Sequence, residues 1–183
     1  MVEWCGKEGV EIWAYSCMPN HTHLVCVPKS EEALRRAIGE AHRRYIRRIN
    51  FREKWRGYLW QGRFASFVMD EPYLLAAARY VELNPVRAKL VARAEDWLWS
   101  SARAHLSGRD DCLVKVAPLL AMVGDWRALL DSALPEGEIE ELRKHARTGR
   151  PLGDDAFFDR LECLLGRLLK PQKGGRPRKT ENQ

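Results

Sequence analysis

Two histidines separated by a single residue, His21 and His23, have the spacing in this chain that most suggests chemistry. They stand at the start of an extended apolar run, and alternate residues of a strand face the same side of a sheet. Their imidazoles would then lie roughly 6.5 Å apart along the backbone, close enough to share one metal ion. A histidine pair on a strand is more often structural, so the spacing alone does not decide between the two roles.

Tyr80 and Asn84 are four residues apart in a segment of helical periodicity, so their side chains share one helix face. Among the five tyrosines, only Tyr80 has an amide side chain four residues later. A tyrosine beside a divalent ion can attack a phosphodiester and form a phosphotyrosine bond. Asn84 would be a third ligand, and oxygen with imidazole favours Mg²⁺ or Mn²⁺. The plainer interpretation makes Tyr80 a core residue and Asn84 a helix terminator.

A zinc site formed by Cys17, His21, His23 and Cys26 is a second interpretation of the same segment. Strand alternation argues against it, because Cys26 would point away from the face that carries the histidines. The five cysteines are odd in number and irregularly spaced, which favours reduced thiols in a cytoplasmic protein over a disulfide framework.

The elements that would position the histidines follow from periodicity and turn residues. A short helix is expected over residues 1–9, and two strands over 11–16 and 21–27 form a hairpin with the histidines near its tip. A long helix is expected from Ser30, as its N-cap, to Asn50, followed by a third strand over residues 64–69.

The helix that carries Tyr80 should begin after Asp70, which can cap it, and should end at Asn84, because Pro85 disfavours helical angles in the residue before it. Short helical turns are expected over residues 86–91 and 97–106. From there to residue 169 the pattern is helical, with helices predicted over residues 116–122, 126–134, 138–146 and 155–169.

The chain has 183 residues, a formal charge of +6 and a pI near 9.2, which favours a polyanionic partner such as nucleic acid. No apolar run is long enough to cross a membrane. A polar turn near residues 107–111 suggests the organisation of the chain. We predict a catalytic domain over residues 1–107, a C-terminal helical region over 108–169 and a basic disordered tail over 170–183.

Basic side chains alternate with aromatic rings around the end of the long predicted helix, as single-stranded DNA binding requires. Trp55, Tyr58 and Trp60 are the rings. The basic residues expected to contact DNA here are Arg43, Arg44, Arg47 and Arg48, with Lys54 and Arg56 beside them. In the tail, Arg176 and Arg178 resemble the minor-groove arginines of an AT-hook, although a solubilising tail is nearly as plausible.

Several stretches occur in the order typical of one protein family: Tyr15–Leu24 (YSCMPNHTHL), Gly57–Phe64 (GYLWQGRF), Arg79–Ala88 (RYVELNPVRA), Trp97–Ser101 (WLWSS) and, toward the C-terminus, Gly149–Gly153 and Gly175–Lys179. With these stretches the chain resembles the IS200-like, or Y1, transposases of the HUH superfamily. Within that family the best agreement is with the REP-associated tyrosine transposases.

The resemblance implies an α+β fold with a ferredoxin-like antiparallel sheet, and nicking and rejoining of single-stranded DNA at REP-like palindromic hairpins. By position, His21 and His23 would bind Mg²⁺ or Mn²⁺ with Asn84 as third ligand. Tyr80 would form a 5′-phosphotyrosine link and free a 3′-hydroxyl. Arg63 and Arg87 lie inside the matching stretches and join the expected DNA contacts. A bacterial, nucleoid-associated cytoplasmic protein, monomeric or homodimeric, is expected.

The family normally has a strand and the front of a helix before the position of Met1. We therefore expect the chain as given to fold less well, or act less well, than one with upstream codons added. Two other functions remain open at this point. One is a non-catalytic DNA-binding protein, and the other is a metal-dependent phosphodiesterase that uses water instead of Tyr80.

Overall fold

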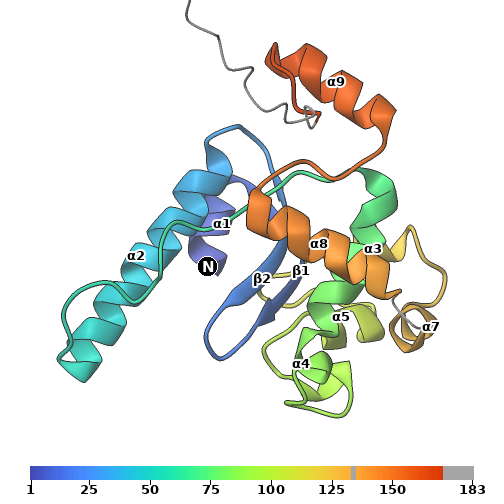
Figure 1. The fold of residues 1–183 in the computed structure, drawn as a ribbon. Coiled ribbons are helices and arrows are strands. Elements are labelled where there is room, and N and C mark those ends of the chain that lie inside the picture. The colour runs from blue at the N-terminus through green and yellow to red at the C-terminus, as the bar shows by residue number, and fades with distance from the viewer. Residues whose placement is uncertain (133–134, 171–183) are drawn as a thin grey trace, which may run out of the picture.

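The structure, a computed structural model, describes residues 1–132 and 135–170. One helix and two consecutive strands open the chain, and helices follow (Figure 1). Their bounds are α1 Val2–Glu8, β1 Val10–Cys17, β2 Thr22–Pro28, α2 Ala33–Glu53, α3 Glu71–Glu82, α4 Asn84–Arg87, the 3₁₀ helix η1 Ala94–Asp96, α5 Ala102–Ser107, α6 Ala117–Leu120, α7 Trp126–Asp131, α8 Glu136–Thr148 and α9 Asp155–Leu165. The predicted α+β class is confirmed, and the arrangement is consistent with a ferredoxin-like transposase domain.

The predicted hairpin of β1 and β2 is confirmed. The two strands pair antiparallel, from Val10 opposite Pro28 to Cys17 opposite Thr22. The backbone N–H of Met18 donates to the carbonyl oxygen of His21 at 2.8 Å and closes the turn between them. The predicted helix before the hairpin is also present, and Gly9 ends it in the left-handed conformation at φ 68°.

A β-bulge between Ile12 and Ala14 sets which core each half of β1 faces. A bulge inserts one residue and so shifts the in-out alternation of a strand. Ile12 accordingly packs against α1 and the start of α2, whereas Ala14 belongs to a second core with Val25 of β2 and Ala78 of α3. The strands thus lie between α1 and α2 on one side and α3 on the other (Figure 1).

A predicted strand and a predicted helix cap are wrong. The described residues form a sheet of two strands, and residues 64–69 join it nowhere. These residues run extended and pair instead with the chain at Leu152, where Met69 forms an isolated bridge. Ser30 does not cap α2 either: the helix begins at Ala33 after a turn, with Glu32 at the N-cap position.

Residues 97–101 lie against β1 instead of forming the first half of the predicted helical turn. Ser100 bridges Ser16 antiparallel, and the N–H of Ser101 donates to the carbonyl oxygen of Tyr15 at 3.0 Å. The helix begins only at Ala102. Val114 bridges Ile12 further along the same edge, so later segments of the chain cover β1 where a third strand would pair.

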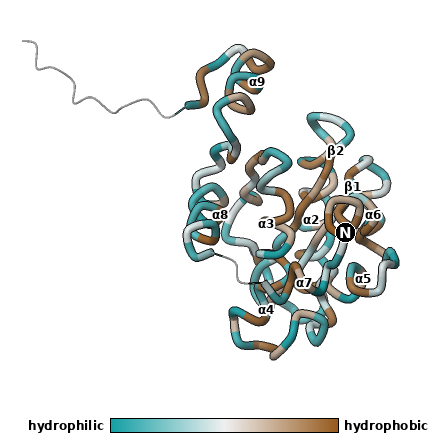
Figure 2. Tube along the Cα trace, turned by 90° about the vertical axis from the view of Figure 1, so that its right-hand side faces the viewer, coloured by the Kyte–Doolittle hydropathy of each residue, from teal (hydrophilic) through white to brown (hydrophobic). Residues whose placement is uncertain are grey.

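The helices after residue 108 contribute to the same core as the strands. Trp126 and Leu130 of α7, Leu142 of α8 and Leu152 are buried in the cluster that contains Ala14 of β1. The core therefore crosses the boundary that the sequence suggests at residue 107. Helix α9 stands apart from the other helices in two views (Figures 1 and 2), and none of its residues is buried.

The basic tail, with Arg176 and Arg178, lies outside the described residues. Among the helices that the structure does describe, none has the length and apolar character needed to cross a membrane.

Candidate active site

The tip of the β-hairpin brings the two histidine rings together. The Nε2 atoms of His21 and His23 are 3.1 Å apart. The side-chain oxygen of Asn20 lies 2.6 Å from Nδ1 of His21 and can only accept, so it holds the proton of that ring on Nδ1. The Nε2 lone pair of His21 is thereby directed toward His23. Two ligands at right angles, each about 2.1 Å from one ion, would be about 3 Å apart, so the pair has the spacing of neighbouring metal ligands.

Tyr80 of α3 lies against this pair. Its ring centroid is 5.7 Å from that of His23, with the planes at 87°. The strand and the helix meet here because Val25 of β2 packs against Ala77, Ala78 and Val81 on the same face of α3. His23 and Val25, two residues apart on β2, therefore both face α3. The convergence of Tyr80 with the histidines, which the sequence only suggested, is present in the fold.

Arg87 of α4 lies over the ring of the tyrosine. Its guanidinium carbon lies 4.0 Å from the centroid of the Tyr80 ring, which is cation–π geometry. Its Nη1 atom is buried and has no partner among the described residues, which leaves a donor for a ligand. We call His21, His23, Tyr80 and Arg87 the His–Tyr corner.

His23 is neutral at physiological pH. Burial, with smaller contributions from His21 and Arg87, lowers its pKa to about 4. A neutral imidazole keeps the lone pair that a metal ligand must offer. The electrostatics of the corner therefore agree with ligation by His23, although the same burial would also suit a structural histidine.

Asn84 lies at the start of α4, 8% exposed, and its Nδ2 atom is buried with no partner in the described part of the chain. Among the described residues, it forms no hydrogen bond with either histidine. Within residues 1–132 and 135–170, no three His, Cys, Asp or Glu side chains gather as a metal site. A divalent ion at the His–Tyr corner would thus have two imidazoles, and Asn84 as ligand stays a prediction.

A buried polar cluster anchors the helix that carries Tyr80. Glu82 is 0% exposed and accepts from Ser101 Oγ at 2.5 Å, from His105 Nδ1 at 2.6 Å and from Trp126 Nε1 at 2.9 Å. The His105 and Trp126 rings stack at 4.2 Å. A buried carboxylate that accepts from three donors fixes the position of α3 against the core. Any rotation or sliding of the helix would leave buried polar groups without partners.

Helix α3 is tied down on a second side by Arg79. This arginine is nearly buried, donates to Ser132 and lies 3.8 Å from Glu138 of α8. Arg79 and Glu82, which lie on either side of Tyr80 along α3, are thus held by residues in or next to α5, α7 and α8. Part of the C-terminal region positions the tyrosine.

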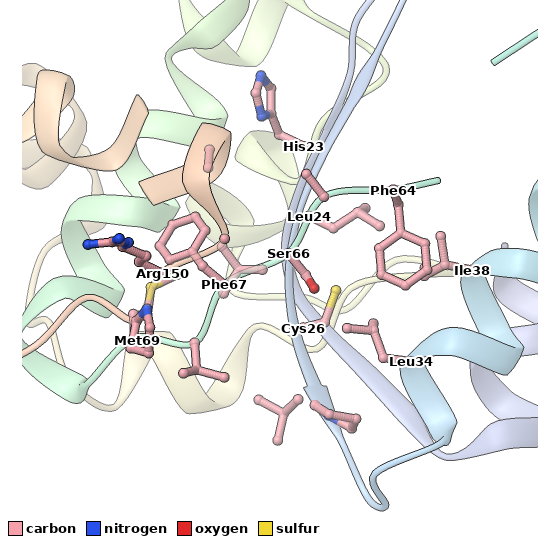
Figure 3. Close-up of a pocket in the computed structure, with 18 of the residues that line it drawn as sticks. His23, Leu24, Cys26, Leu34, Ile38, Phe64, Ser66, Phe67, Met69 and Arg150 are labelled. Atoms are coloured by element: carbon pink, nitrogen blue, oxygen red, sulfur yellow. The ribbon is translucent and has the colours of Figure 1, made fainter. Parts of the chain in front are cut away.

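A groove of about 1750 Å³ begins at the histidines and follows the free edge of β2 (Figure 3). No backbone hydrogen bond joins residues 22–27 to any described segment other than β1. Leu24 and Cys26 of β2 point into the groove, and Phe64 lies between them and Ile38 of α2 (Figure 3). Trp60 and Arg63 line it farther along.

The predicted DNA-binding arginines have different surroundings. Arg43 and Arg44 are exposed, and each forms an ion pair with Glu40 at 2.6 and 3.0 Å. The two guanidinium groups lower the pKa of Glu40 to about 2, so its charge offsets one of theirs. Arg47, Arg48 and Arg63 are exposed and form no ion pair with any described residue. Arg87 lies in the His–Tyr corner.

Residues 1–84 match the family model described as "Transposase IS200 like". The chain is similar to the IS200-like transposases. The matched range contains His21, His23, Tyr80 and Asn84, and the similarity implies an activity related to DNA transposition. No curated protein and no solved structure matches the chain.

Residues that complete the site lie partly outside the range matched to the IS200-like model. Arg87, Ser101, His105 and Trp126 all follow residue 84. One signal for the buried cluster was visible in the sequence: Glu82 is an acidic residue near the end of a mostly apolar stretch of α3. No signal was visible for Asn20, whose contact with His21 depends on how the hairpin turns.

Proposed function

We propose that this chain nicks and rejoins single-stranded DNA at REP-like hairpins through a 5′-phosphotyrosine link to Tyr80. The observation that carries the proposal is the placement of the Tyr80 ring against His23, with the His21 and His23 Nε2 atoms converging beside it. The order of the sequence stretches around Tyr15–Leu24 and Arg79–Ala88 supports the REP-associated branch. Action on DNA is consistent with nucleoid association.

His21 and His23, with Asn84 as the third candidate, would hold Mg²⁺ or Mn²⁺. Such an ion, when bound, neutralises phosphate charge and polarises the scissile phosphorus. The phenol of Tyr80 loses its proton to water, and Oη forms a bond to phosphorus. The bond to the 3′ oxygen breaks, and that oxygen takes up a proton to become the 3′-hydroxyl. Arg87 offers its buried Nη1 to a phosphate oxygen.

A covalent adduct trapped on a denaturing gel tests the proposal. Wild-type protein, a single-stranded hairpin labelled at its 3′ end and Mg²⁺ or Mn²⁺ should give a labelled band at the mass of the protein plus the fragment on the 3′ side of the cut. Tyr80→Phe should abolish the band, whereas Tyr58→Phe, at a tyrosine 94% exposed on the loop after α2, should keep it. Cleavage by Tyr80→Phe without an adduct would instead identify a hydrolase that uses water.

A non-catalytic DNA-binding protein is the second candidate function. The observation in its favour is that the described residues offer a cation only the two imidazoles as His, Cys, Asp or Glu ligands. It predicts tight binding of the hairpin and neither cleavage nor adduct in the same assay.

A further inference from the structure

The far end of α2 and the loop after it, residues 44–63, form an exposed aromatic and basic surface that we call the α2 tip. Helix α2 extends away from the sheet, and the chain after it returns alongside the helix (Figure 1). Phe51 is 89% exposed, Trp55 59% and Tyr58 94%. Large rings so open to water are unusual for a folded protein and indicate an interaction site when they lie together.

The α2 tip is an ordered part of the fold. The Asn50 side-chain amide donates to the carbonyl oxygen of Gly57 at 2.9 Å, which closes the turn at the end of the helix. Trp60 then stacks on His42 at 4.3 Å and lies 5.7 Å from the Tyr45 ring. The loop is thus fastened to α2 by the partly buried rings of His42 and Trp60, and Tyr58 stays exposed.

The charge around these rings is strongly positive. Residues 44–63 contain seven basic side chains, Arg44, Arg47, Arg48, Arg52, Lys54, Arg56 and Arg63, against the single acid Glu53. Arg47 and Arg48 precede Phe51 by four and three residues on α2, so all three share a face of the helix. Neither arginine forms an ion pair with any described side chain. Cations flanking an exposed ring are the arrangement that binds phosphates and stacks a base.

We propose that the α2 tip binds unpaired bases of single-stranded DNA, away from the His–Tyr corner. Phe51 and Tyr58 stack on bases, and Arg47 and Arg48 contact the phosphates. The groove lined by Trp60 and Arg63 joins the two places, and Phe51 is about 20 Å along α2 from Ile38, which lines the groove beside β2. The choice of DNA as the polymer rests on the proposed function. A second copy of the chain fits this surface less well, because two such basic tips repel each other.

Fluorescence anisotropy with labelled dT20 tests the stacking. This strand has no hairpin, and EDTA in the buffer prevents cleavage. Phe51→Ala/Tyr58→Ala should raise the Kd at least tenfold, since one stacked base accounts for about fivefold or more in affinity. The control Leu90→Ala/Leu98→Ala removes two exposed apolar side chains elsewhere and should leave the Kd within about twofold. Phe51→Leu keeps an apolar side chain without a ring, and full affinity in that variant would overturn the stacking role.

The salt dependence of the same binding tests the phosphate contacts. Arg47→Gln/Arg48→Gln should reduce the slope of log K against log salt by roughly 1.4, about 0.7 for each phosphate released on a single strand. The control Arg109→Gln/Arg147→Gln removes the same charge from exposed positions elsewhere and should leave the slope unchanged. An equal change in both variants would overturn the proposal by showing binding through net charge alone.

Sedimentation velocity separates DNA binding from self-association. If Phe51→Ala/Tyr58→Ala converts a dimer to a monomer, the α2 tip is an interface between copies and the proposal fails. Failure here is distinguishable from failure of the proposed nicking. The Tyr80 adduct depends on the His–Tyr corner, whereas dT20 binding in EDTA depends on no catalytic residue.

Discussion

At the His–Tyr corner an arginine covers a half-buried tyrosine, with Arg87 4.0 Å from the Tyr80 ring. At the α2 tip, by contrast, Phe51 is 89% exposed beside two arginines that pair with no acidic side chain in the described part of the chain. Both regions combine cations with aromatic rings. The corner is built from three separate segments and backed by the buried Glu82 cluster. The tip is one helix end and its following loop. Long-range contacts suit a reaction that needs fixed geometry, and local exposure suits a flexible strand.

The largest expected effect that separates the two regions is on cleavage. His21→Ala should lower the nicking rate on the order of a thousandfold, because a divalent ion contributes several kcal/mol to the transition state of phosphoryl transfer. Hairpin binding in EDTA should remain nearly intact. His145→Ala on α8 is the matched control and should keep the activity. Parallel loss of hairpin binding in His21→Ala would mark the histidines as structural.

The same chemical change should destabilise one region and spare the other. Glu82→Gln places an amide opposite three buried donors and should lower the free energy of unfolding by about 2–4 kcal/mol. Glu53→Gln at the α2 tip touches only the exposed ion pair with Arg52 and should stay within about 0.5 kcal/mol. Urea unfolding followed by circular dichroism measures both. If Glu82→Gln and Glu53→Gln had the same free energy of unfolding, the Glu82 cluster would not anchor α3.

Removal of the arginine in the corner should affect the rate more than the affinity. Arg87→Met keeps apolar contact with Tyr80 but loses the charge, and we expect nicking to slow by about 10- to 100-fold. Arg47→Met at the α2 tip should instead weaken dT20 binding and leave the single-turnover rate at saturating protein unchanged. Single-turnover nicking at several protein concentrations separates the two effects. The comparison fails if Arg87→Met changes only the affinity.

The smallest expected effect is a pH dependence that arises at the corner. Because burial lowers the pKa of His23 from 6.5 to about 4, folding favours the neutral ring. That stabilisation is present above pH 6.5 and is lost as the pH falls toward 4. The Tm in EDTA should therefore drop less between pH 7 and 4.5 in His23→Asn than in the wild type. His145→Asn on α8 also removes one histidine and serves as the control.

Much of the local structure was predictable from the sequence. The hairpin at His21, the end of α1 at Gly9 and the helix that starts after Asp70 follow from turn and capping residues that act within a few positions. Even here the hydrogen-bond partner of the Asp70 side chain differs from the prediction. Its side chain caps nothing in α3 and accepts instead from the N–H of Asp154 at 3.1 Å.

The segments predicted with the wrong structure are those whose partners lie far along the chain. Residues 64–69 have the composition of a strand, yet they pair with residues around Leu152 and not with the sheet. Trp97–Ser101 looked helical and became the cover of the β1 edge, where the Trp97 Nε1 donates to the Cys17 carbonyl oxygen at 3.0 Å. Periodicity reports which face of an element is apolar and does not identify the partner of that face.

The sequence by itself determined the chemical inventory: an alternating histidine pair, a tyrosine on a helix and a basic, aromatic helix end. Those features depend only on residue types at short spacing. In a strand or helix, residues at such spacing point to the same side of the element. Only the tertiary structure decided that Tyr80 lies against His23 and under Arg87, that α7 and α8 hold α3 in place, and that Phe51 remains in water. Such contacts join residues tens of positions apart, and packing of the whole core selects them.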